Sequence, residues 1–162
     1  MKKKRNKPVL KLFLRIAILV ACAFIVLQIF PMKRMSGHYM YPSVRDGDFC
    51  IFYTLEAPYP DNIILYRYNG GLRMGRVVAV PGQTIEVTDD GYLVNGYQSA
   101  EEIPFQTQKN GDVIKYPLAL SEDEYFILND YRMENEDSRT FGAIKKKDIV
   151  GKMMFILRRR GF

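Results

Sequence analysis

The longest apolar stretch of the chain lies close to its N-terminus. From Leu12 to Phe30 the sequence reads LFLRIAILVACAFIVLQIF, and only Arg15 and Gln28 interrupt it. At 1.5 Å per residue, a helix over this stretch is about 30 Å long, which matches the hydrocarbon core of a bilayer. We therefore predict a transmembrane anchor over residues 12–30, in which the Arg15 side chain extends to the headgroups.

Basic residues gather on the N-terminal side of this stretch, where six Lys and Arg residues precede Leu12. Nine of the 24 Lys and Arg residues, and none of the 18 Asp and Glu residues, precede Met35. Because the cytoplasmic flanks of membrane helices carry an excess of Lys and Arg, we predict a cytoplasmic tail over residues 1–11 and an extracytoplasmic domain over residues 35–162. The expected location is the cell membrane, as a single-pass protein with its N-terminus in the cytoplasm.

A cleaved signal peptide or a lipoprotein signal is the alternative to this anchor. Ala21-Cys22-Ala23 supplies the small residues of a cleavage site, and Leu19-Val20-Ala21-Cys22 resembles a lipoprotein box. Residues 24–27 continue the apolar run beyond that point, whereas a cleaved signal is followed by a polar mature start. The pattern therefore favours the uncleaved anchor.

After Pro31 the pattern changes to short stretches of β-branched and aromatic residues. Such stretches are typical of strands, and turn residues such as Asn69-Gly70 and Asp90-Gly91 separate them. No helical period continues beyond the anchor. We predict a mainly β fold, a small antiparallel β domain in which residues 98–118 form an exposed excursion. The predicted strands are residues 48–53, 63–68, 73–80, 84–88, 92–94, 125–128 and 149–157.

The net charge of +6 does not indicate nucleic-acid binding. The nine basic residues before Met35 leave the rest of the chain with a net charge of −3, whereas a nucleic-acid-binding domain needs clustered cations on its folded surface. The two cysteines do not indicate a disulfide, because Cys22 falls in the predicted anchor and Cys50 in the external domain. We expect Cys50 to be a small buried hydrophobe, with a thiol nucleophile as the alternative.

Three segments carry the candidate chemistry. Residues 36–48 read SGHYMYPSVRDGD, residues 76–82 read RVVAVPG, and residues 129–142 read NDYRMENEDSRTFG. In this order, and behind one N-terminal anchor, they resemble the type I signal peptidases of family S26, membrane serine proteases that remove signal peptides with a Ser/Lys dyad. The resemblance extends over nearly the whole chain, and the short length with a single anchor is similar to the Gram-positive members.

The resemblance fails at the catalytic positions. The family has Gly-x-Ser-Met-x-Pro where this chain has GHYMYP, so Tyr39 stands in place of the nucleophile. Gly75 stands in place of the general-base lysine of a Lys-Arg-Val motif, and Asn135 in place of a serine that supports this lysine. The resemblance therefore implies no catalytic residue in this chain. The retained motif residues that we expect to contribute to binding are Gly37, Met40, Pro42, Arg76 and Val77.

The chemistry of these side chains agrees with a loss of activity. A serine hydroxyl attacks an amide only when a base takes its proton, and a lysine serves as that base only when it is neutral. Gly75 offers no base, and the protonated phenol of Tyr39 is bulkier and less nucleophilic than the expected hydroxyl. We hypothesise that the Tyr39 ring packs over Gly75 and closes the former catalytic centre.

A relocated active site remains the alternative. Ser36, Ser43 and Ser138 are hydroxyls near the motifs, and His38 adjoins Tyr39. Neighbours along an extended chain point to opposite faces, which directs His38 away from whatever Tyr39 faces. A divergent, active serine-type signal peptidase is thus the second interpretation.

The retained part of the third segment predicts structure rather than chemistry. We expect Asp137 and Arg139 to form a structural ion pair that, together with Ser138, holds this segment against the sheet. The turns at residues 45–48 and 81–82 are of a kind that any β domain uses.

The leading functional hypothesis follows from the resemblance. Similar members that lack the dyad occur beside Gram-positive pilus genes and act as assembly factors for pilin subunits. This implies that the chain binds exported polypeptides, pilins foremost, by adding an extended segment to a sheet edge. The cell membrane and a pilus sortase are the other expected partners, and regulation of an active paralogue is a third interpretation. None of these hypotheses requires a cofactor or a metal ion.

Overall fold

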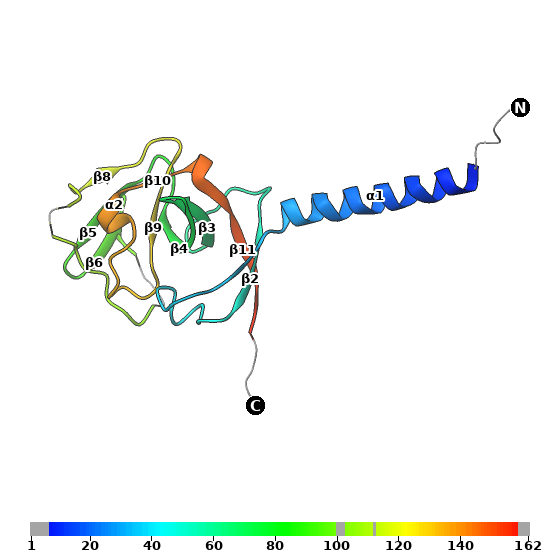
Figure 1. The fold of residues 1–162 in the computed structure, drawn as a ribbon. Coiled ribbons are helices and arrows are strands. Elements are labelled where there is room, and N and C mark those ends of the chain that lie inside the picture. The colour runs from blue at the N-terminus through cyan, green and yellow to red at the C-terminus, as the bar shows by residue number, and fades with distance from the viewer. Residues whose placement is uncertain (1–6, 100–102, 112, 159–162) are drawn as a thin grey trace, which may run out of the picture.

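A long N-terminal helix and a β domain make up the protein (Figure 1). The computed structural model describes residues 7–99, 103–111 and 113–158. Residues 1–6 of the predicted tail, and residues 100–102 and 112 of the predicted excursion, lie outside this description.

Helix α1 (Lys7–Ile29) extends away from the β domain (Figure 1). Its Val9–Ile29 part is long and apolar enough to cross a membrane. The helix begins at Lys7, within the predicted basic tail, and it contains nearly all of the anchor predicted over residues 12–30.

The end of α1 is tied directly to the β domain. Strand β1 (Met32–Arg34) follows the helix almost at once. The Ile29 carbonyl accepts a hydrogen bond from the Thr54 N–H at 3.2 Å. The Phe30 ring stacks on the Tyr53 ring with 5.5 Å between the centroids. Helix and domain are therefore joined without a free linker.

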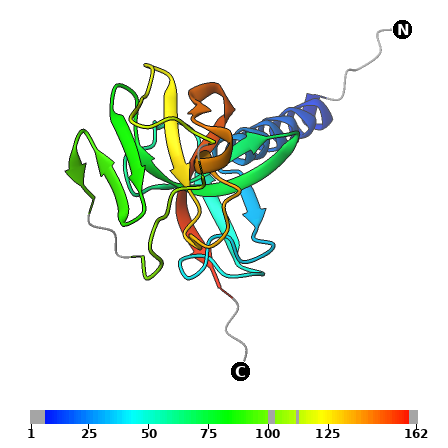
Figure 2. The same ribbon diagram turned by 90° about the vertical axis from the view of Figure 1, so that its left-hand side faces the viewer.

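Two antiparallel sheets form the described part of the β domain, and they confirm the predicted mainly β fold class. The larger sheet has the strand order β1-β2-β11-β3-β4-β9-β10, and the smaller has β7-β6-β5-β8. Figures 1 and 2 show the smaller sheet on the side away from α1. The strands after β1 are β2 (Phe49–Tyr53), β3 (Ile63–Tyr68), β4 (Gly71–Ala79), β5 (Thr84–Thr88), β6 (Gly91–Val94), β7 (Tyr97–Gln98), β8 (Leu118–Ala119), β9 (Glu124–Leu128), β10 (Ile144–Lys145) and β11 (Ile149–Leu157).

Every strand predicted from the sequence is present. The prediction missed β1, β7, β8 and β10, because strands of two or three residues are too short to show an alternating pattern. It also missed the short helical turns α2 (Ser138–Phe141) and η1 (Lys146–Asp148). The β3–β4 turn follows the predicted chemistry, since Asn69 and Gly70 have positive φ values of 48° and 75°, as a tight hairpin turn requires.

Apolar residues of the first motif hold this motif in the hydrophobic core. Met40 and Val44 from that motif pack in one cluster with Cys50, Leu65 and Met74 from strands β2, β3 and β4. All of them are fully buried, and each side chain of this size contributes about 1.5–3 kcal/mol through burial. Burial raises the pKa of Cys50 to about 11, so this thiol stays protonated and is the buried hydrophobe that we expected.

Strand β4 changes its partner halfway along. Its first half pairs with β3, and β9 pairs with it only from Arg76 onward. Within the described residues, no strand pairs with the second edge of Gly71–Gly75. Strand β1, at the end of the larger sheet, likewise pairs only with β2. Both segments present main-chain N–H and C=O groups along an open edge.

The segment after β9 is held by a buried ion pair. Arg139 binds both carboxylate oxygens of Asp137, with Nε–Oδ1 at 2.9 Å and Nη2–Oδ2 at 2.7 Å. Asp137 also accepts a hydrogen bond from the Asn129 N–H, and the Ser138 Oγ accepts one from the Ile127 N–H at 3.0 Å. These bonds fasten the third motif to the end of β9.

The predicted excursion is exposed only in part. Thr107 is buried, and its Oγ1 accepts a hydrogen bond from the Arg132 Nε at 2.9 Å. The Gln108 carbonyl accepts one from the Arg139 Nη1 at 3.3 Å. The excursion therefore supplies acceptors to two buried guanidinium groups, which is why this segment cannot be fully exposed.

Gly151 in β11 has no space for a side chain. A Cβ there would lie 2.6 Å from the Tyr53 carbonyl oxygen, so the β2 main chain would have to move. We expect Gly151→Ala to lower the free energy of unfolding by about 1–3 kcal/mol, the range for overpacked sites. Thermal unfolding of the full-length protein in detergent measures this. Gly71→Ala is the control, because its Cβ would come no closer than 3.6 Å to another group; an equal loss in both variants would contradict the prediction.

Breaking the buried ion pair should be costly. We expect Arg139→Met to lower the free energy of unfolding by about 3–5 kcal/mol, because the Asp137 charge is left buried without its partner. Lys145→Met is the matched control, since Lys145 and Asp123 are half exposed and 3.7 Å apart, and such pairs contribute about 1 kcal/mol or less. Denaturant unfolding in detergent compares the two variants, and similar losses would show that the Asp137 pair contributes no more than a surface pair.

Candidate functional site

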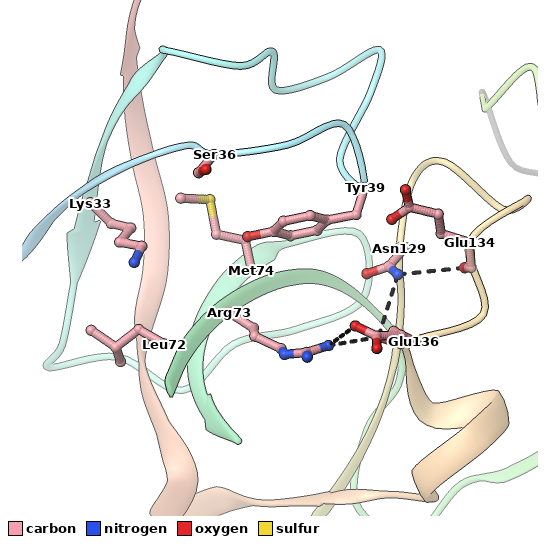
Figure 3. A pocket seen from close by; sticks show the side chains of 9 residues that line it. All are labelled: Lys33, Ser36, Tyr39, Leu72, Arg73, Met74, Asn129, Glu134 and Glu136. Carbon is pink, nitrogen blue, oxygen red and sulfur yellow. Dashed lines mark hydrogen bonds and ion pairs between the residues drawn. The ribbon is translucent and has the colours of Figure 1, made fainter. Parts of the chain in front are cut away.

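A pocket opens between the first motif, β1 and β4 (Figure 3). Its volume is about 260 Å³, slightly below the roughly 300–1,000 Å³ of typical small-molecule sites. This size suits one or two side chains of a bound peptide. The lining residues are Lys33, Ser36, Tyr39, Leu72, Arg73, Met74, Asn129, Glu134 and Glu136.

Tyr39 lies across this pocket (Figure 3). Its half-buried ring passes over Met74 of β4 and packs against the core cluster beneath. Its carbonyl accepts a hydrogen bond from the Tyr131 N–H at 3.0 Å, which ties the first motif to the third. Burial raises the pKa of the phenol, and hydrogen bonding to the Met74 main chain opposes this only in part. The phenol is therefore protonated at neutral pH.

The side-chain position of Gly75 is filled by its neighbours. A Cβ at Gly75 would collide with Cγ2 of Ile127 and would lie 3.4 Å from Cε1 of Tyr66. Ile127 and Tyr66, rather than the Tyr39 ring, thus occupy the space that a lysine stem would need. Our hypothesis that the Tyr39 ring fills this space is wrong, because successive residues of a strand face opposite sides and the ring packs on the Met74 side.

Asn135 is exposed and is directed toward the excursion. Its side-chain amide donates a hydrogen bond to Asn110 Oδ1 at 3.4 Å, and its carbonyl accepts bonds from the Asp137 N–H and the Thr140 hydroxyl. It does not line the pocket. Of the three positions that the resemblance associates with catalysis, Tyr39 lines the pocket, Gly75 is covered by apolar side chains, and Asn135 lies outside.

Arg76 connects the three motifs. Its Nε and Nη2 each bind one carboxylate oxygen of Asp130 at 2.7 Å, the bidentate geometry of a strong ion pair. Its Nη2 also donates to Ser43 Oγ at 3.1 Å, and its Nη1 donates to the Asp61 carbonyl at 2.7 Å. Arg76 thus holds the loops in place from outside the pocket lining.

Two predicted binding residues belong to the core. Met40 and Val77 are both 0% exposed, so their side chains pack in the core and do not line the pocket, and a part in binding stays a prediction for them. Gly37 has a φ of +92°, and a Cβ there would lie 3.6 Å from the Tyr39 ring. Pro42 follows a cis peptide bond. Neither Gly37 nor Pro42 lines the pocket.

Sequence reasoning missed the charged residues around the pocket. Arg73 of β4 forms an ion pair with Glu136 at 2.8 Å, and Lys33 and Glu134 add one further charge of each sign. Arg73 could have been found from its place two positions before Gly75 on a predicted strand. Lys33 was missed because it was counted among the basic residues that flank the anchor.

The comparisons with known proteins agree with this geometry. Residues 8–158 match the family described as signal peptidase, peptidase S26. The chain is 25% identical to signal peptidase I T of Bacillus subtilis, over 95% of this chain and 88% of that protein. It is 27% identical to a signal peptidase IB of Staphylococcus aureus, over 93% of this chain and 90% of that protein.

A solved structure is also similar. A signal peptidase I from Enterococcus faecalis superposes with a TM-score of 0.52 at 26% identity, covering 62% of this chain and 100% of the solved one. The apolar helix α1 and the similarity to signal peptidase I together indicate a membrane-anchored protein. Because the family match includes the helix, the β domain and all three motifs, the protein belongs to the signal peptidase, peptidase S26, family.

Proposed function

We propose that this protein is a catalytically inactive, signal peptidase I-like membrane protein that binds exported polypeptides and assists the assembly of pilin subunits at the cell surface. The observation that carries the proposal is the packing at Gly75. The place of a general-base side chain is filled by Ile127 and Tyr66, so the position that carries the lysine in the family offers no base here.

The electrostatics of the pocket support the loss of catalysis. Amide cleavage by a Ser/Lys pair needs a neutral amine in an apolar site. The pocket instead contains a protonated phenol beside charged groups, among them the Arg73–Glu136 ion pair. Removing members of a catalytic triad costs on the order of 10⁶ in rate, and we expect a loss of that order from the two positions together.

The open strand edges support polypeptide binding. Leu72, Arg73 and Met74 line the pocket and belong to the half of β4 that has only one strand partner. An extended polypeptide can add to such an edge through main-chain hydrogen bonds, and this mode needs no catalytic side chain.

The proposed orientation and partners follow from the anchor and from the family. With a cytoplasmic N-terminus, as the basic flank favours, the β domain lies on the outer face, where exported polypeptides arrive. Pilin subunits are the proposed clients, and a pilus sortase is a further proposed partner. Both rest on the resemblance to pilus-assembly members of the family, which is an analogy of function.

One observation favours a second candidate, an active signal peptidase with a relocated nucleophile. Ser36 and Lys33 both line the pocket, which places a hydroxyl and an amine at the same opening (Figure 3). Under this candidate Ser36 would attack the scissile amide.

Cleavage of exported precursors separates the two candidates. We expect the natural full-length chain, reconstituted in lipid vesicles, to leave several precursors uncut over hours, as followed by gel electrophoresis. Cleavage that Ser36→Ala abolishes would overturn the proposed inactivity and support the second candidate. Loss of cleavage in Leu55→Ala would instead indicate general damage, because Leu55 lies on another surface.

Reinstating the two family residues should not restore activity. We expect Tyr39→Ser with Gly75→Lys to leave precursors uncut, because a side chain at position 75 meets Ile127 on the sheet face opposite to the Tyr39 ring. Adding Ile127→Ala relieves the collision but leaves that direction unchanged, so we expect the triple variant to be inactive as well, as followed by gel electrophoresis. Cleavage by either variant would contradict the packing described at Gly75.

Binding of pilin precursors tests the positive half of the proposal. We expect Leu72→Asp to weaken binding about tenfold, equivalent to about 1.4 kcal/mol, because it places a charge where the polypeptide docks. Surface-immobilised full-length protein and purified precursor give the affinity by interferometry. Leu55→Asp changes an exposed leucine on another surface and should leave the affinity unchanged. The binding proposal fails if the natural chain retains none of the precursors.

A further inference from the structure

The pocket is bordered by two strand edges that have no partner on the pocket side. Lys33 belongs to β1, which pairs only with β2, and Leu72 and Met74 belong to the half of β4 that pairs only with β3. Both statements concern the described residues. A segment bound here would therefore take its main-chain hydrogen bonds from β4 beside Met74 or from β1 beside Lys33.

The Tyr39 ring covers the β4 edge at this place. In Figure 3 the ring lies across Met74, with its hydroxyl beside the Met74 main chain. An incoming segment would need the main-chain groups of the edge that the ring lies across. The ring and a bound segment therefore compete for the same space.

The loop that carries Tyr39 is fixed, whereas its side chain has room to turn. The buried Met40 side chain and the hydrogen bond from the Tyr131 N–H to the Tyr39 carbonyl hold the main chain. Gly37 has no side chain beside the ring. The half-buried ring can thus leave the edge by rotation of its own torsions, a change that needs no movement of the loop.

We propose that Tyr39 is a displaceable cover of the polypeptide site: at rest its ring shields the β4 edge at Met74, and a bound extended segment turns it outward and takes its place. This inference rests on the proposed function, since it assigns Tyr39 a part in polypeptide binding. It makes Tyr39 an affinity-setting residue of this chain, at the position where the family resemblance alone implied only a lost nucleophile.

The size of the effect follows from the population of the uncovered state. If the uncovered state holds about 10% of the molecules, the apparent affinity is about tenfold weaker than that of an uncovered site. We expect Tyr39→Ala to remove this penalty and to tighten the binding of pilin-precursor peptides about tenfold. Fluorescein-labelled synthetic peptides and the full-length protein in nanodiscs give this affinity by anisotropy.

A second measurement needs no ligand. Hydrogen exchange of residues 71–75, followed by mass spectrometry on the same nanodiscs, should become about tenfold faster in Tyr39→Ala, because the edge is open more of the time. Tyr39→Leu keeps an apolar side chain against the core cluster and therefore serves even if Tyr39→Ala fails to fold. We expect it to bind the peptides about threefold more tightly, because a leucine covers less of the edge than the ring does.

Tyr41→Ala is the matched control. Tyr41 is a second tyrosine on the same loop, packs toward Phe105 at 6.2 Å and does not line the pocket, so both readouts should stay unchanged. Unchanged exchange in Tyr39→Ala and Tyr39→Leu, with binding by the natural chain intact, shows that Tyr39 is not a cover and leaves the proposed function standing. Weaker binding by both variants also overturns the inference, since Tyr39 would then be a contact residue. Faster exchange without peptide binding by any variant overturns the inference together with the proposed function.

Discussion

The guanidinium of Arg76 holds together segments that are far apart in the sequence, and the shape of the pocket depends on it. It binds the Asp130 carboxylate with two hydrogen bonds of 2.7 Å, its Nη2 also donates to the Ser43 Oγ, and its Nη1 donates to the Asp61 carbonyl. Asp130 is fully buried, so without Arg76 its carboxylate would keep, within the described residues, only the longer ion pair with Arg132, at 3.9 Å. The three motifs can therefore keep their relative positions whether or not the site they surround performs chemistry.

This dependence explains which parts of the family pattern persist in the chain. Arg76, Asp137 and Arg139 belong to buried ion pairs whose disruption would destabilise the fold. Tyr39, Gly75 and Asn135 belong to no such network, and each has contacts of another kind: aromatic packing on Met74, close approach of Ile127, and a hydrogen bond to Asn110. The residues that hold the scaffold together must therefore keep their charges. The residues at the three positions that the family uses for catalysis have no such requirement.

Much of the fold could be predicted from the sequence, because the longer strands alternate regularly and Asn-Gly and Asp-Gly turns separate them. The short strands could not be predicted, since two residues such as Ile144-Lys145 have no period and pair only because β9 lies beside them. The site was less predictable than the fold. Tyr39 and Gly75 could be singled out from the motif pattern. The collision at Gly75 could not be predicted, because it depends on Ile127, which is 52 positions further along the chain and meets Gly75 only through the pairing of β4 with β9. The place of Lys33 in the pocket could not be predicted either, because only the fold brings β1 to the same opening as β4.

The tight junction between α1 and the β domain has a consequence for encounters with other molecules. The Ile29–Thr54 hydrogen bond and the stacking of Phe30 on Tyr53 leave little freedom for the domain to tumble independently of the helix. With the helix in a bilayer, the opening between β1 and β4 stays at a constant height above the lipid and travels only by lateral diffusion. Molecules tethered to the same membrane then meet it at a high effective concentration, whereas those released into the surroundings do not. The anchor and the tight junction at its end thus let the opening meet its partners by diffusion in the plane of the membrane.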